Sequence, residues 1–61
     1  MIWLTRKYGE GKTIVNITNY DYMIQAEGGG TEIYFGGLNV LTVKESVEEI
    51  WNMINGWRTN G

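Results

Sequence analysis

The chain has 61 residues, of which 43% are hydrophobic, and it carries a formal net charge of −2 without any cysteine or histidine. Such a chain forms one domain with a marginal core, and its composition excludes disulfides and disfavours a zinc site. Five basic residues are too few for the basic face of a duplex-binding protein, and no apolar run approaches the ~18 residues of a membrane span. No secretory signal pattern opens the chain, so a cytoplasmic location is the default expectation.

Two-residue alternation of apolar and polar side chains predicts strands at the start of the chain. A first strand over residues 1–5 places Ile2 and Leu4 on one face and Trp3 on the other. A glycine-containing turn then leads into a second strand over residues 13–17, which is rich in β-branched side chains.

The middle of the chain predicts a meander of hairpins. A polar bend of asparagine, threonine and aspartate precedes a third strand over residues 22–27. The glycine turn at residues 28–30 leads into a fourth strand over residues 31–35, and the glycine turn at residues 36–37 leads into a fifth over residues 39–43.

The period changes to that of a helix after the fifth strand. Ser46 and Glu49 have the S-x-x-E spacing of a capping box, and Gly56 is a natural residue to end the helix. Helical spacing predicts an apolar stripe against the sheet, made of Val47, Ile50, Trp51 and Ile54. These patterns together predict one small α+β domain over residues 1–61. It has a bent antiparallel sheet of four to five strands within 1–43, one packed C-terminal α-helix over about 46–55, and a frayed tail over 58–61.

The aromatic content predicts self-association. Three Trp, four Tyr and one Phe are many for so small a core, so some of them should contact a partner. The candidate contact residues are Trp57, Met53 and Trp3. The alternative for Trp57 and Met53 is that both fold back under the edge of the sheet.

The sequence gives little support for catalysis. Histidine and cysteine, two of the commonest catalytic side chains, are absent. Glu45, Glu48 and Glu49 are explained by the helix start, and the remaining acids lie beside turns and not in a cleft. We therefore expect a protein that is not an enzyme and that uses neither cofactor nor metal.

The first turn offers an alternative, anion-binding interpretation. Residues 9–13 end in Gly-Lys-Thr like a phosphate-binding loop, but Arg6 stands where that pattern needs glycine and a strand follows instead of a helix. A basic cluster remains around this turn. In an oligomer such turns could hold a phosphate-bearing ligand through Arg6, Lys7 and Lys12, with stacking on Tyr8, Tyr20 or Tyr22.

Two segments resemble a known family. Met1-Ile2-Trp3-Leu4-Thr5-Arg6 and Val43-Lys44-Glu45-Ser46-Val47-Glu48-Glu49-Ile50 are similar to the two ends of the FlbD (SwrD) family of small bacterial flagellar accessory proteins. The similarity is collinear over residues 1–54, although this chain has more glycine in its turns and more tryptophan. The resemblance implies a cytoplasmic, non-catalytic protein that supports the flagellar motor through protein contacts.

The leading hypothesis is therefore a self-associating protein-interaction module, with itself and an unknown protein as partners. The first alternative is a phage-encoded oligomeric protein that binds or sequesters a nucleotide-like ligand. The second is a single-stranded nucleic-acid binder that uses an aromatic sheet face, which the acidic balance of the chain disfavours.

Overall fold

The computed structural model describes the backbone of residues 1–59 and the side chains of residues 1–56. Five strands precede one α-helix, and each strand lies within two residues of its predicted bounds. The elements in chain order are β1 (Ile2–Thr5), β2 (Lys12–Val15), the 3-10 helix η1 (Ile17–Asn19), β3 (Tyr22–Gln25), β4 (Thr31–Tyr34), β5 (Val40–Val43) and α1 (Val47–Thr59).

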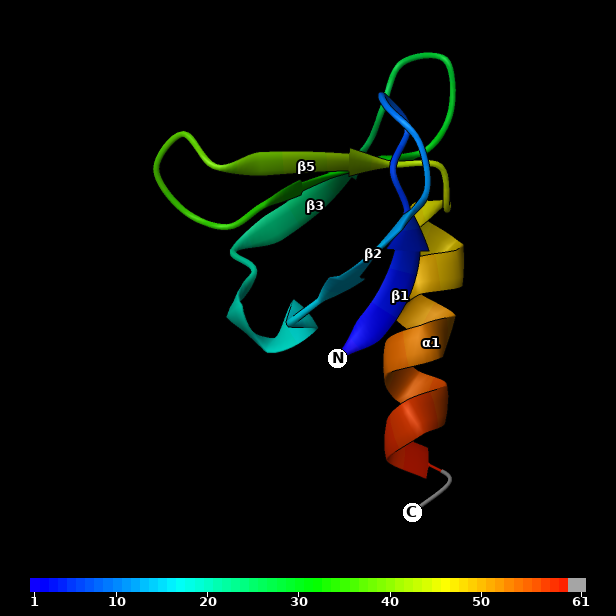
Figure 1. Ribbon diagram of the computed structural model, residues 1–61. Coiled ribbons are helices and arrows are strands. Elements are labelled where there is room, and N and C mark those ends of the chain that lie inside the picture. The colour runs from blue at the N-terminus through cyan, green and yellow to red at the C-terminus, as the bar shows by residue number, and fades with distance from the viewer. Residues whose placement is uncertain (60–61) are drawn as a thin grey trace.

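The strands form two antiparallel ladders, a β1–β2 hairpin and a three-stranded meander in the order β3-β4-β5. A single bridge between Arg6 and Val43 links the hairpin to β5. Backbone hydrogen bonds flank this bridge, from Lys7 N to Thr42 O at 3.0 Å and from Lys44 N to Thr5 O at 2.8 Å. The predicted α+β fold is confirmed, with two sheets in place of one bent sheet. The helix α1 lies beside β1 (Figure 1), and its backbone also approaches β3.

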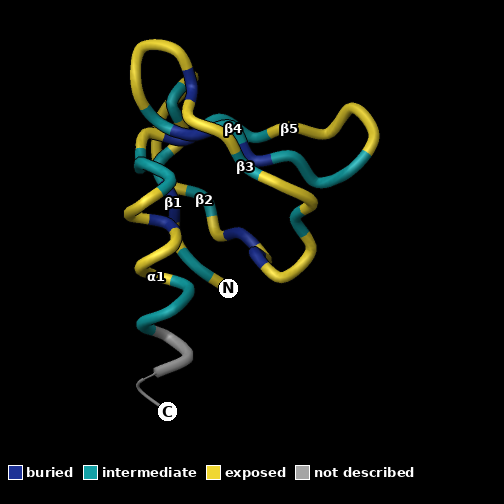
Figure 2. The backbone as a smooth tube through the Cα atoms, turned by 180° about the vertical axis from the view of Figure 1, so that it is seen from behind, coloured by how far each residue is buried: buried dark blue, intermediate teal, exposed yellow. Residues whose placement is uncertain are grey.

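One apolar core joins both ladders and the helix. Its buried members are Leu4, Val15, Ile17, Ile33, Val43 and Ile50. As predicted, Leu4 points inward from β1, while Trp3 between its neighbours keeps 59% of its surface exposed. Buried positions are scattered along every strand except β3, and the turns are largely exposed (Figure 2). The outer faces of the two ladders therefore both point away from this shared core.

The capping box at the start of α1 is confirmed. Ser46 N donates to Glu49 Oε1 at 2.8 Å, and Glu49 N donates to Ser46 Oγ at 3.0 Å. Ile50 is fully buried, and Ile54 packs against the core from the next turn. Trp51 was expected on the same stripe, but 54% of its surface is exposed. Trp51 lies about 100° around the helix from Ile50, so the buried stripe follows the two isoleucines and leaves the indole largely outside it.

The predicted end of the helix at Gly56 is wrong, because α1 continues to Thr59. Glycine inside a helix costs only about 1 kcal/mol relative to alanine, so one glycine does not stop a helix that is already capped and packed. The predicted tail therefore begins inside the helix at Arg58, and residues 60–61 lie outside the described backbone.

Glu45 has a different role from the one expected at the helix start. Its carboxylate accepts hydrogen bonds from Thr5 N at 2.9 and 3.1 Å and from Thr5 Oγ1 at 2.9 Å. Its carbonyl accepts from the buried Thr31 Oγ1 at 2.8 Å. Glu45 thus fastens β1 and β4 to the start of the helix, across 40 and 14 residues of sequence.

Candidate interaction site

The outer face of the β3–β4–β5 ladder carries exposed apolar side chains from both of its edge strands. The strand register places Tyr22, Tyr34 and Val40 in one row, while Ile24 and Glu32 share another row. Alternation sends these side chains away from the core, and Tyr22 and Ile24 remain 53% and 46% exposed. We call this surface, made of Tyr22, Ile24, Glu32, Tyr34 and Val40, the tyrosine face.

Two rings order the centre of the tyrosine face. Tyr22 and Tyr34 stack with their centroids 4.6 Å apart and their planes 13° apart. The Tyr34 hydroxyl donates to Glu32 Oε1 at 2.9 Å. This hydrogen bond, together with desolvation and the charge of Glu32, raises the pKa of Tyr34 above its usual value of 10.0. The rings are therefore held in place before any partner arrives, which lowers the entropy cost of binding.

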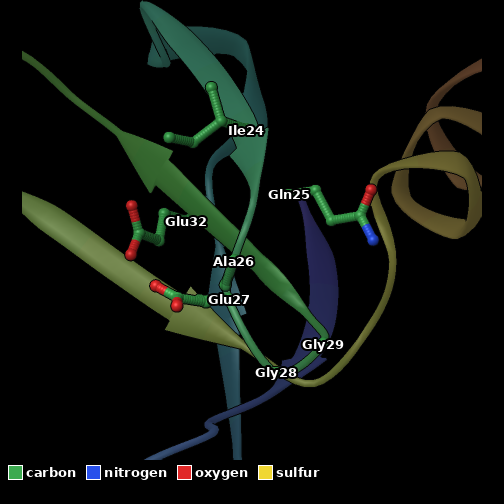
Figure 3. Close-up of a pocket in the computed structure, with 7 residues that line it drawn as sticks. All are labelled: Ile24, Gln25, Ala26, Glu27, Gly28, Gly29 and Glu32. Atoms are coloured by element: carbon green, nitrogen blue, oxygen red, sulfur yellow. The ribbon is translucent and has the colours of Figure 1, made fainter.

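The tyrosine face ends in an acidic hollow beside the β3–β4 turn. Ile24, Glu27 and Glu32 project to the same side of the hairpin, whereas Gln25 points to the opposite side (Figure 3). The hollow has a volume of about 640 Å³ and is open to solvent. Two carboxylates beside an aliphatic and aromatic surface favour a partner that carries apolar side chains and a positive charge.

The outer face of the β1–β2 hairpin has the opposite charge. Cross-strand pairing places Trp3 opposite Ile14 and Thr5 opposite Lys12, all on the side away from the core. Trp3 and Ile14 are both more than half exposed. Lys12 is exposed, and its ammonium makes no hydrogen bond or ion pair within residues 1–56. We call Trp3, Lys12 and Ile14 the tryptophan face.

The basic cluster expected around the first turn does not converge on an open site. The Lys7 ammonium donates to the carbonyls of Glu27 at 3.0 Å and Gly29 at 2.7 Å, and it lies 5.6 Å from the centroid of the exposed Tyr8 ring. The Arg6 guanidinium donates to the Glu10 carbonyl. Both cationic side chains are therefore engaged in hydrogen bonds to the backbone of turns. Of the three basic residues, only Lys12 is left to face solvent without such a bond.

The remaining predicted site residues are separated from one another. Tyr20 packs partly buried against the core, so it does not share the surface of Tyr22. Met53 is 37% exposed on α1, and the side chain of Trp57 lies outside the described residues.

The sequence interpretation missed Ile24, Glu32 and Tyr34 as site residues. Their alternation in the third and fourth predicted strands was the available signal, because it places them on one face once those strands pair.

Within the described residues, no three acidic, histidine or cysteine side chains gather as metal ligands, and no helix is both long and apolar enough to cross a membrane. No protein-family model, curated protein or solved structure matches the chain. The resemblance to the FlbD family therefore stays a prediction.

Proposed function

We propose that this protein is a non-catalytic interaction module that associates with itself and with other protein through the tyrosine face. The observation that carries the proposal is an ordered apolar surface on the solvent side of the sheet, with Ile24 and Val40 flanking a stacked tyrosine pair. Contiguous exposed apolar surface on a small protein typically marks a protein contact. Aromatic anchors held in fixed positions contribute most of the binding energy at such contacts.

The phosphate-ligand and nucleic-acid alternatives have less support. A phosphate site needs free cations, but Lys7 and Arg6 donate to backbone carbonyls. A single-stranded nucleic acid could stack on Tyr22 and Tyr34, yet Glu32 lies beside these rings and Glu27 follows at the hollow. Carboxylates at that position repel a phosphate backbone. The flagellar setting is carried by the family resemblance alone.

The test is a solution mass measurement on an exposed-residue variant. Ile24→Gln removes an exposed aliphatic side chain between the tyrosine pair and the acidic hollow, so we expect it to lower the mass of the assembly or the affinity for a partner. Trp51→Gln is the control, because Trp51 is similarly exposed but lies on α1.

Native mass spectrometry of the wild type and of the Ile24→Gln, Trp51→Gln and Met53→Gln variants gives the copy number and detects any retained ligand. A wild-type protein that stays monomeric and binds no protein contradicts the proposal. An extra mass of a few hundred daltons per site favours the ligand-binding alternative. Loss of assembly in Met53→Gln but not in Ile24→Gln would move the contact to the helix.

A further inference from the structure

We propose that copies of this chain associate head to tail, with the tryptophan face of one copy on the tyrosine face of the next. This proposal rests on the proposed function and adds which surfaces meet. Both faces are apolar at the centre, since Trp3 and Ile14 lie on one and Tyr22 and Ile24 on the other. They differ in the charge that accompanies the apolar side chains.

Charge complementarity selects the head-to-tail arrangement over symmetric pairing. Two tyrosine faces in contact would place the carboxylates Glu27 and Glu32 of both copies in one interface without a lysine from either face. Two tryptophan faces would place two copies of Lys12 in one interface without a carboxylate from either face. A tryptophan face on a tyrosine face instead brings the unpaired Lys12 ammonium to the acidic hollow. Like charges in an interface suppress one arrangement, and opposite charges favour the other.

The fold allows both faces of one copy to be occupied at once. Leu4 and Val15 of the hairpin and Ile33 and Val43 of the meander bury their side chains in the same core. The two outer faces therefore point away from that core in separate directions, and one occupied face leaves the other free. Contacts between two different surfaces produce a ring if the rotation closes and an open chain if it does not.

The size of the faces sets the expected strength. Three strands of four residues cover roughly 10 × 14 Å, from the usual strand spacing and rise per residue. This footprint of about 140 Å² is only a fraction of the ~800 Å² that each partner buries in an interface of standard size. We therefore expect association that grows with protein concentration across the micromolar range, and not a permanent dimer.

Charge reversal tests the pairing of the faces by sedimentation velocity over a concentration series. Lys12→Glu and Glu32→Lys should each weaken self-association by roughly tenfold or more, because each places like charges in the contact. An equimolar mixture of the two variants should restore it, since every contact in an alternating assembly again joins opposite charges. Lys44→Glu is the matched control: it makes the same charge change at an exposed lysine outside both faces.

Glu32 also accepts a hydrogen bond from the Tyr34 hydroxyl, so the replacement of Glu32 removes a contact within the fold as well as a charge. Glu27→Lys is therefore a second charge reversal that leaves this hydrogen bond in place. Circular dichroism verifies folding of each variant. Association in Lys12→Glu equal to wild type overturns the head-to-tail pairing while leaving the proposed function standing. Lack of rescue in mixtures of folded variants, or equal weakening by Lys44→Glu, also overturns it. A wild type that stays monomeric throughout the series overturns this proposal, and only the additional lack of any protein partner overturns the proposed function.

Discussion

At the scale of single residues, the tyrosine face depends on a hydrogen bond between a phenol and a carboxylate. The Tyr34 hydroxyl lies 2.9 Å from Glu32 Oε1, and its proton is held there by a negative charge. Because the pKa of Tyr34 is raised in the folded state, folding favours the protonated phenol. This contribution to stability is fully present below the ordinary tyrosine pKa, and it is lost as the pH rises through the higher folded value.

We expect Glu32→Gln to bring the pKa of Tyr34 back toward its ordinary value, because the carboxylate charge disappears and the hydrogen bond to the neutral amide is weaker. An NMR titration of the four tyrosine rings measures this directly. Tyr22 stacks on the same ring but makes no hydrogen bond to Glu32, so it provides the internal comparison. An unchanged Tyr34 titration in the variant would show that the bond to Glu32 is not its cause.

Gly30 is the glycine whose missing side chain matters most to packing. Its φ is +87°, and an added Cβ would overlap the Val43 carbonyl oxygen on β5. We expect Gly30→Ala to destabilise the fold by about 3 kcal/mol or more, since backbone strain adds to a clash with rigid backbone. Gly29→Ala is the matched control. It also has a positive φ, of +105°, but has open space around the added atom and should cost about 1–2 kcal/mol. If denaturant melts showed the same loss in the free energy of unfolding for Gly30→Ala and Gly29→Ala, the proposed clash with Val43 would be wrong.

At the scale of elements, local patterns predicted more than tertiary contacts did. Alternation and glycine turns located five strands, because both signals act over a few neighbouring residues. The bonds of Glu45 to Thr5 and of Lys7 to Glu27 join segments 40 and 20 residues apart, and no local spacing indicates them. The prediction that Trp51 packs against the sheet was wrong for the same reason, since its exposure depends on how much of the helix the sheet covers.

The candidate site was predictable only in part. Trp3 was correctly placed on the outer face of its strand, because alternation decides this locally. Alternation indicates which side chains of each strand share the tyrosine face, but the pairs across strands also require the register that places Tyr22 beside Tyr34 and Ile24 beside Glu32. If the register shifted by one residue, the outward side chains of one strand would point into the core instead.

The start of α1 can be tested at the capping box. Ser46→Ala removes the hydroxyl that accepts from Glu49 N at 3.0 Å, so one amide of the first turn loses its partner. We expect a loss of about 1 kcal/mol in the free energy of unfolding. Chemical denaturation followed by circular dichroism measures it. Stability equal to that of the wild type would mean that water replaces the Ser46 hydroxyl as the hydrogen-bond acceptor of Glu49 N at no cost.

At the scale of the whole molecule, two short ladders and one helix act as a unit because each contributes to a single core. The β1–β2 hairpin is too small to be stable alone, since a two-stranded hairpin is marginal in water. Leu4, Ile33 and Ile50, from three different elements, are all fully buried in one cluster. The bridge at Arg6 and the bonds of Glu45 tie the same parts together at the backbone.

This shared core predicts cooperative unfolding with a small margin. Ile50→Ala leaves a cavity at the point where the helix meets both ladders, and we expect it to cost about 3 kcal/mol. Ile14→Ala removes the same atoms from an exposed position and should change stability by about 0.5 kcal/mol or less. Melts of both variants followed by circular dichroism and by the NMR signals of Tyr20 and Tyr22, which lie outside α1, should have coincident transitions. A helix signal lost before the tyrosine signals change would show that α1 detaches first, because only a core that all three parts complete together unfolds in one step.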